Sequence, residues 1–295
     1  MKVAVLSDIH GNLPALQTAA AHIESWRPDF VIVNGDVVNR GPLSRPCLNF
    51  VQARQQRDDW QVVRGNHEEY VLACGRNDVA RTGYEDELMR FAHWTRAQLN
   101  GETAALGELP DQRSLRAPDG SELRVTHAAV GNNRDGIYEK TPNAELRRQI
   151  GLPPAVFVTA HTHRPLIRHI DETLVVNVGS AGAPFDGDDR LSYGQFTWER
   201  RSGWQAEIVR LAYDRRQTER DYVESGFLDE GGPLAQLMLV ELRRAGGLIY
   251  RWASRYQAAM LAGDISLESS VRQLLGDEDL RPYLGAPGWE LQGKR

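Results

Sequence analysis

The chain has 295 residues, of which 41% are hydrophobic and 25% are charged, which suits one large globular domain or two smaller ones. Its formal net charge of -5 argues against nucleic acid as a general partner. The two cysteines are too few for a disulfide framework or a thiolate metal site. No apolar run is long enough to span a membrane, and residues 1–6 are too short for a signal peptide, so we expect a cytoplasmic protein.

Short apolar runs alternate with amphipathic segments in the first quarter of the chain. Residues 3–7, 30–33 and 60–63 are predicted strands, and residues 46–54 form a predicted helix. Asn12 and Pro14 mark the start of an earlier helix, where Asn12 is expected either to cap the helix or to reach the site. This alternation predicts an α/β sheet with parallel members, whose sites form beyond the carboxyl ends of the strands.

The middle of the chain adds more strands. A longer helix is predicted over residues 84–99, and a hairpin over residues 115–127 turns at Pro118-Asp119-Gly120. A further strand at 155–159 is followed by strand-like runs at 166–170, 173–178, 193–198 and 205–211. Since several of these runs are adjacent in sequence, the sheet is expected to be mixed.

The composition shifts near Tyr213, which divides the chain into a domain at 1–212 and a helical extension at 213–295. Apolar residues recur every three or four positions in the extension, at 234, 238, 242, 245, 249, 252, 256 and 260, with an interruption at Gly246-Gly247. We expect these helices to pack on the core, although the same stripe would also suit a lid or a homodimer contact. The chain from about Gly285 onward is expected to be loose.

Five short polar clusters follow the predicted strands. They are Asp8-Ile9-His10, Gly35-Asp36, Gly65-Asn66-His67, His127, and His161-Thr162-His163. Each cluster alone is weak evidence, because a lone Gly-Asp is usually a turn and a lone histidine is usually structural. Their joint occurrence, each after an apolar run, favours a single site built from carboxylate, amide and imidazole groups.

These groups suit divalent metal ions such as Mn, Fe, Zn, Co or Ni. In an extended segment residues i and i+2 point to the same side, so Asp8 and His10 are expected to face one ion together. His161 and His163 have the same spacing, although a turn could divide them between two ions. Asp36 has two oxygens and can bridge two ions about 3.5–4 Å apart, a pair that clamps a phosphoryl group.

The order and spacing of the clusters resemble the calcineurin-like metallophosphoesterase superfamily, whose pattern is Asp-x-His, Gly-Asp, Gly-Asn-His-Asp/Glu, His and Gly-His-x-His. The resemblance spans residues 1–211, and the stretch Asn177-Val-Gly-Ser180 is similar to the small bacterial and archaeal phosphodiesterase branch. It implies a four-layer α/β/β/α sandwich with mixed sheets. It also implies a phosphoester hydrolase with two divalent ions, with Mn or Fe favoured, and a metal-bridging hydroxide as nucleophile.

The resemblance assigns a role to each of the eight side chains. One metal ion would be held by Asp8, His10, Asp36 and His163, and the other by Asp36, Asn66, His127 and His161. His67 would stay off the metals beside the substrate, where it would stabilise transition-state charge or protonate the leaving oxygen.

Arg40 is a further candidate for the site. The run Gly35-Asp-Val-Val-Asn-Arg40-Gly resembles an element of phosphoprotein phosphatases and diadenosine tetraphosphate hydrolases in which the arginine holds phosphate oxygens. The alternative interpretation is that Arg40 is a loop arginine that forms an ion pair at the surface. We expect Arg40 to bind phosphate and the substrate to be a small phosphoester: a nucleotide-type phosphodiester, a phosphomonoester or a dinucleoside polyphosphate.

Three departures from the family pattern limit the assignment. Asn39 stands where phosphoprotein phosphatases carry an aspartate that pairs with the catalytic histidine, so the imidazolium of His67 would lack that support. Ala160 replaces a glycine, and the glycines common after His127 are absent. These differences argue mildly against a phosphoprotein phosphatase without excluding one. A non-catalytic scaffold with the same fold and a nuclease are also compatible with the pattern, but less well than a hydrolase of small phosphoesters.

Overall fold

The structure is a computed structural model, and it describes residues 1–76 and 83–285. Its first sheet has five strands in the order β10-β9-β1-β2-β3. Strands β1, β2 and β3 are parallel, whereas β9 runs antiparallel to both β1 and β10. The strands of this sheet are β1 (Lys2–Leu6), β2 (Phe30–Asn34), β3 (Gln61–Val63), β9 (Leu191–Glu199) and β10 (Gly203–Leu211).

The second sheet also has five strands, in the order β4-β5-β6-β8-β7. Strands β5, β6 and β8 are parallel, and the edge strands β4 and β7 are antiparallel to their neighbours. Both sheets are therefore mixed, as the sequence predicts. The strands are β4 (Gln112–Arg116), β5 (Glu122–Thr126), β6 (Val156–Thr159), β7 (Leu166–Ile170) and β8 (Thr173–Asn177).

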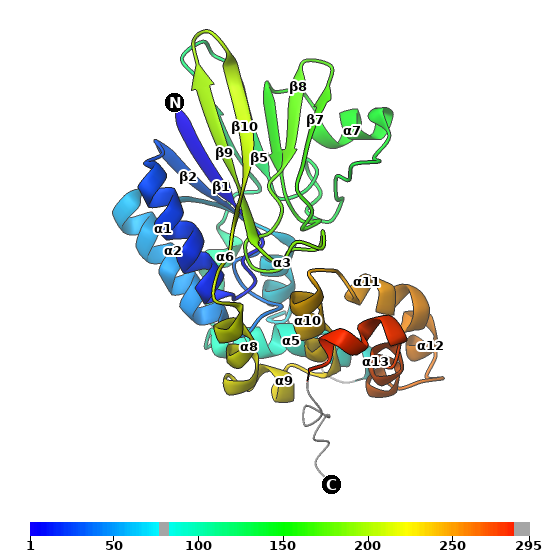
Figure 1. The fold of residues 1–295 in the computed structure, drawn as a ribbon. Helices are drawn as coiled ribbons and strands as arrows, with labels where there is room; N and C mark the ends of the chain where they lie inside the picture. The colour runs from blue at the N-terminus through cyan, green and yellow to red at the C-terminus, as the bar shows by residue number, and fades with distance from the viewer. Residues whose placement is uncertain (77–82, 286–295) are drawn as a thin grey trace.

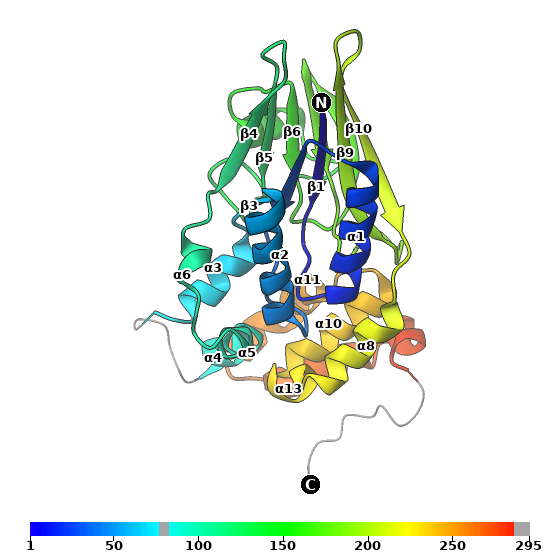
Figure 2. The ribbon, with the colours of Figure 1, turned by 90° about the vertical axis from the view of Figure 1, so that its left-hand side faces the viewer.

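The two sheets face each other across an apolar core and have helices on their outer sides. Fully buried valines fill the space between the sheets, with Val3 and Val5 of β1 packing in one cluster with Val125, Val158 and Val176. Helices α1 (Leu13–Trp26) and α2 (Ser44–Asp58) cover the first sheet, and α7 (Asn143–Ile150) covers the second (Figures 1 and 2). The predicted four-layer α/β/β/α architecture is confirmed.

Helix α1 shows how the local sequence sets an element at the site. The side chain of Asn12 accepts a hydrogen bond from Ala15 N at 3.2 Å and caps the helix, and a proline stands in its first turn. The sequence predicts an apolar stripe of Leu13, Leu16, Ala20 and Ile23 on this helix; the last three are buried and Leu13 is partly buried. Of the two expectations for Asn12, capping is the one that the structure bears out.

The helices after β3 differ in part from the single long helix that the sequence predicts over residues 84–99. They are α3 (Asn66–Ala73), α4 (Tyr84–Leu88), α5 (Arg90–Gln98) and α6 (Ala104–Gly107). The single helix predicted over 84–99 is wrong, because the backbone leaves the helical conformation at Met89 (φ -95°, ψ 3°). Residues on both sides of the break, Leu88 of α4 and Phe91 and Trp94 of α5, pack against the apolar core of the C-terminal helices.

The C-terminal part of the described chain is helical, as its apolar periodicity predicts. The predicted interruption at Gly246-Gly247 falls between two of these helices. Residues 286–295, which include almost all of the stretch predicted to be loose, lie outside the described residues. The elements are α8 (Arg215–Glu224), α9 (Phe227–Glu230), α10 (Pro233–Arg244), α11 (Ile249–Trp252), a π-helix (Ala253–Gln257), α12 (Ala258–Leu261), α13 (Leu267–Leu275) and a 3-10 helix (Glu278–Tyr283).

These C-terminal helices, called the helical extension from here on, have a buried core of their own. In Figure 1 strand β1 runs away from the N-terminus toward the extension, which lies beyond the end of the sandwich where β1 finishes. The extension is joined to the loop before α1 by a hydrogen bond from Thr218 Oγ1 to Asn12 Oδ1 at 2.9 Å. No helix in the two described ranges is long and apolar enough to cross a membrane.

Phe227 provides a test of whether the extension packs on α5 as a structural unit. Its ring is fully buried, with its centroid 4.8 Å from that of Trp94 in α5 and 5.5 Å from that of Tyr222 in α8. Phe227→Ala should lower the free energy of unfolding by about 3–5 kcal/mol, because it leaves a cavity at this junction. Urea denaturation followed by tryptophan fluorescence measures the loss.

Tyr250→Ala is the matched control, because Tyr250 lies in the same extension with 86% of its surface exposed. It should change the free energy of unfolding by no more than about 0.5 kcal/mol. Equal effects of the two substitutions would contradict the packing of the extension described above.

Candidate metal centre

The eight side chains predicted to form one site follow strands of both sheets, six of them in loops and two, Asn66 and His67, in the first turn of α3. Seven of them are at most 8% exposed, and His161 is the one that is partly exposed. They come from the ends of five strands: Asp8 and His10 follow β1, Asp36 follows β2, Asn66 and His67 follow β3, His127 follows β5, and His161 and His163 follow β6.

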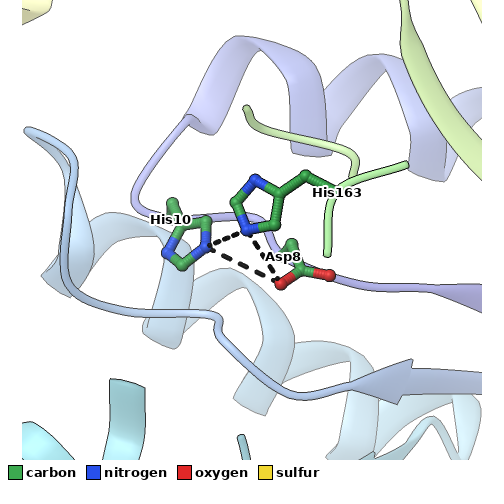
Figure 3. A group of neighbouring side chains, drawn as sticks. All are labelled: Asp8, His10 and His163. Carbon is green, nitrogen blue, oxygen red and sulfur yellow. Dashed lines mark hydrogen bonds and ion pairs between the residues drawn. The ribbon is translucent and has the colours of Figure 1, made fainter. Parts of the chain in front are cut away.

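Asp8, His10 and His163 form the first group, drawn in Figure 3. Oδ1 of Asp8 lies 3.2 Å from Nε2 of His163 and 3.8 Å from Nε2 of His10. The two Nε2 atoms are 3.1 Å apart and face each other. Three potential ligand atoms of a metal ion therefore converge on one point.

Asn66, His127 and His161 form a second group beside the first. The Asn66 side-chain oxygen lies 3.0 Å from Nε2 of His127 and 2.9 Å from Nδ1 of His161. Asp36 lies between the groups, since its Oδ2 is 3.3 Å from His127 Nε2 and 3.7 Å from His10 Nε2. This intermediate position is the one that a bridging carboxylate needs.

Two carboxylate oxygens at the site have the burial and the missing hydrogen bonds that are expected where a cation binds. Oδ1 of Asp8 and Oδ2 of Asp36 are buried and accept no hydrogen bond, although imidazole nitrogens lie close by. A buried carboxylate oxygen without a partner carries a large desolvation cost, which a bound cation would offset.

Backbone carbonyls orient three of the imidazoles. Nδ1 of His127 donates to Asn34 O at 2.8 Å, and Nδ1 of His10 donates to Asn39 O at 3.2 Å. His163 donates in the same way to a carbonyl of the loop after β8. Each bond keeps a proton on Nδ1 and directs Nε2 inward, the arrangement typical of metal-ligating histidines, in which Nε2 carries no proton once a metal ion is bound.

The backbone at the site is left-handed, which corrects the expected geometry. Asp8, His10 and Asp36 have φ values of 52°, 49° and 54°, and His161 and His163 have 63° and 57°. The expectation that Asp8 and His10 face one ion because they alternate along an extended segment is therefore wrong, even though their side chains do converge. Left-handed residues other than glycine are strained by about 1–3 kcal/mol each and gather at functional sites.

Backbone hydrogen bonds between neighbouring loops hold these strained residues in place. His10 N donates to Asp36 O at 2.9 Å, and Asp8 N donates to Gly35 O at 3.2 Å. The loops after β1 and β2 therefore support each other, and Asp8 and Asp36 are fixed relative to one another.

The charges at the site perturb one another. Burial by itself would lower the pKa of His127, but the adjacent Asp36 carboxylate outweighs it and raises the pKa to about 10. Burial would raise the pKa of Asp36, yet the charge of His127 lowers it well below its usual range. Burial, followed by the charge of His127, lowers the pKa of His161 to about 4.

Glu68 supports the site, a role that was not assigned to it from the sequence. The family pattern includes an acid at this position, and the structure shows that Glu68 is fully buried under the loop that carries Asp36. Oε2 accepts hydrogen bonds from Asp36 N and Gly65 N, both at 2.8 Å, and Oε1 accepts one from Val37 N at 2.8 Å. Burial, followed by the negative charge of Asp36, raises the pKa of Glu68 to about 7.

His67 is held by Asn39, the residue that departs from the phosphoprotein phosphatase pattern. Nδ2 of Asn39 donates to Nδ1 of His67 at 3.0 Å, and Thr95 Oγ1 donates to the Asn39 side-chain oxygen at 3.2 Å. An amide donor at Nδ1 places the imidazole proton on Nε2. Burial lowers the pKa of His67 to about 3, against the raising effect of Asp36, so His67 is a neutral hydrogen-bond donor.

The role of His67 away from the metals stays a prediction. Its ring nitrogen lies in a third group of potential ligand atoms with His10 and Asp36, all within 4.8 Å of one another. The family resemblance, and not these distances, separates His67 from the ligands.

Arg40 lies beside this centre and is paired with the helical extension. Its guanidinium forms an ion pair with Glu241, a residue that is 2% exposed and that the sequence does not assign to the site. It also lies 5.4 Å above the ring of Phe185, which stacks on His163 with 4.2 Å between centroids. The sequence does contain a feature that could have pointed to Glu241: it is a charged residue within the apolar stripe formed by positions 234, 238 and 242.

The first two thirds of the chain match a known family. The family model of the calcineurin-like phosphoesterase superfamily domain matches residues 1–201. The chain belongs to this superfamily. Members of the family depend on two metal ions, and the described residues include candidate groups for holding them.

Similar proteins differ in how much of their length they share with this chain. An uncharacterized protein of Methanocaldococcus jannaschii is 25% identical over 242 residues, which are 76% of this chain and 92% of that protein. The symmetrical bis(5'-nucleosyl)-tetraphosphatase of Azotobacter vinelandii is 28% identical over 173 residues, 50% of this chain and 61% of that protein.

Solved structures with the same fold support the architecture described above. A metallophosphoesterase from Sphaerobacter thermophilus superimposes with a TM-score of 0.62 and 23% identity, over 83% of this chain and 100% of that one. A hypothetical protein from Pyrococcus horikoshii gives a TM-score of 0.64 and 21% identity, over 78% of this chain and 98% of that one.

Metal binding should release protons, since His127 holds a proton in the metal-free protein. Its pKa of about 10 lies above the ordinary 6.5, so protonation stabilises the metal-free fold fully below pH 6.5 and is lost as the pH rises through 10. Metal affinity should rise about tenfold per pH unit between pH 7 and 9, with release of about one proton. Calorimetric titration of Mn²⁺ in two buffers of different ionisation enthalpy measures both quantities. An affinity that does not vary with pH in this range would contradict the role of His127.

Proposed function

We propose that the protein is a dinuclear-metal-dependent phosphoester hydrolase that acts on small nucleotide-type phosphoesters. The observation that carries the proposal is the position of Asp36 between two groups of ligand atoms, with a buried oxygen that accepts no hydrogen bond. Two adjacent cation sites that share a carboxylate suit phosphoryl transfer, where charge develops on the attacking and leaving oxygens.

The ligand sets follow from the two groups. Asp8, His10 and His163 would hold one ion, and Asn66, His127 and His161 would hold the other, with Asp36 shared between them. When bound, the ions would polarise the phosphoryl oxygens and activate a water molecule for attack.

His67 supplies the remaining proton chemistry in this proposal. Because Asn39 donates to its Nδ1, His67 keeps its proton on Nε2 and can donate a hydrogen bond to a phosphoryl or leaving-group oxygen. A neutral donor stabilises developing charge without first having to gain a proton. The missing aspartate is thus replaced by an amide that orients the ring without holding it as an imidazolium.

Arg40 supports a substrate with an accessible phosphate group. Its planar guanidinium can pair with two phosphate oxygens, and it lies next to the metal groups, as its contact with Phe185 over His163 indicates. Because one relative is a bis(5'-nucleosyl)-tetraphosphatase, dinucleoside polyphosphates are the first substrates to assay.

Asp36→Asn tests the proposed chemistry most simply. It keeps the shape of the side chain and removes the shared charge, so turnover of an aryl phosphate in Mn²⁺ should fall about 10³-fold or more. A steady-state assay with p-nitrophenyl phosphate, its bis-ester and diadenosine tetraphosphate measures the loss and ranks the substrate types.

Asp171→Asn is the matched control, because the Asp171 carboxylate is 59% exposed and pairs with Arg147 at the surface. It should leave turnover unchanged. Full activity of the wild-type protein after exhaustive metal removal would contradict the proposal, as would a fully active Asp36→Asn.

A further inference from the structure

The strongest feature outside the metal groups is an ion pair that joins the helical extension to the phosphoesterase domain. Arg40 lies in the loop after β2, and Glu241 lies in α10, 201 residues further along the chain. Side-chain exposure is 14% for Arg40 and 2% for Glu241. A pair buried to this extent is not a solvated surface contact, and removing one partner leaves the other charge uncompensated.

The Glu241 carboxylate cannot move away from Arg40 without breaking other bonds. Oε2 faces the arginine, and Oε1 accepts hydrogen bonds from the backbone N–H groups of Leu248 and Ile249, the latter at 2.8 Å. These two N–H groups lie at the start of α11, where no helical carbonyl is available to them. The acceptor therefore has a fixed position, set by the turn between α10 and α11.

The other contacts of Arg40 fix its backbone and the face of its guanidinium. The hydroxyl of Tyr222 in α8 donates to Arg40 O at 3.3 Å, and Arg40 itself has a left-handed backbone with φ 65°. The guanidinium lies over the Phe185 ring, which has Gly247 of the extension on its border. The extension thus contacts Arg40 directly at its backbone through Tyr222 and at its guanidinium through Glu241.

The ion pair with Glu241 leaves other donors of the guanidinium for a ligand. Nη2 forms the bond to Glu241, and within the described part of the chain Nε and Nη1 have no hydrogen bond. The guanidinium also lies close enough to His67 for its charge to act there, after the larger effects of burial and of Asp36. A guanidinium held on one edge by a carboxylate and open on the other is suited to bind a phosphate oxygen.

We propose that Glu241 is a positioning residue that aligns Arg40 for binding a phosphate group beside the metal centre, so that the helical extension completes the active site. This inference rests on the proposed function, since it takes a phosphoester as the ligand. Glu241 does not contact the substrate; it acts through Arg40. The extension is then required for phosphate affinity and not only for stability.

The test is a double-mutant cycle with Arg40→Gln and Glu241→Gln in the full-length Mn²⁺-loaded protein, read out by calorimetric binding of inorganic phosphate. Glu241→Gln should weaken phosphate binding on the order of tenfold, as expected for a hydrogen bond to a charged group, and Arg40→Gln should weaken it more. In the Arg40→Gln background, Glu241→Gln should have no further effect, because its only route to the ligand is already lost.

The same four proteins assayed with an aryl phosphate give a second readout. Glu241→Gln should raise KM on the order of tenfold and change kcat less than about twofold, because Arg40 holds a phosphate oxygen in the ground state and the transition state alike. Glu219→Gln, which breaks the 2.9 Å pair with Arg243 in the same extension, is the matched control and should change neither constant.

Three results would overturn the inference: unchanged phosphate affinity in Glu241→Gln, tighter binding in that variant, or an additive double mutant. Tighter binding would mean that Glu241 competes with phosphate for Arg40. If Glu241→Gln does not fold, Glu241→Asp, which keeps the charge but is one methylene shorter, replaces it in the cycle and should weaken binding by a smaller factor. If the wild-type protein turns over no phosphoester, the proposed function fails, whereas the phosphate-binding cycle still tests the role of Glu241.

Discussion

The burial of two carboxylates at the ends of adjacent parallel strands is the constraint on which the rest of this site depends. Asp8 and Asp36 are at most 1% exposed, and each has an oxygen that accepts no hydrogen bond. Two such charges side by side are unstable without compensating positive charge. The surrounding imidazoles supply part of it, as the raised pKa of His127 shows, and divalent ions would supply the rest.

Much of the surrounding structure serves to keep these two groups in place. Glu68 is a third buried carboxylate, but unlike the other two it is satisfied by backbone N–H groups of the loop that carries Asp36. Carbonyls orient His10 and His127, and left-handed backbone directs the ligand side chains toward one another. The local strain is tolerated because the loops after β1 and β2 are bonded to each other and supported by the two sheets.

The sequence could predict which polar clusters come together, because each is a short polar run directly after an apolar strand. Strand and helix periodicities could predict an α/β fold with a mixed sheet, whereas the four layers were implied only by the family resemblance. The sequence could not predict the left-handed turn at Asp8 and His10, because alternation in an extended segment places their side chains on one side equally well. It missed the break at Met89 and the pairing of Arg40 with Glu241, since both depend on packing between segments far apart in the chain.

The central claim, that these side chains hold two metal ions with Asp36 between them, is tested most directly by anomalous diffraction from crystals grown with Mn²⁺. We expect two anomalous peaks in each chain, about 3.5–4 Å apart, one within coordination distance of Asp8 and the other of His127, with Asp36 shared. A single peak, or two peaks that do not share Asp36, would contradict the account.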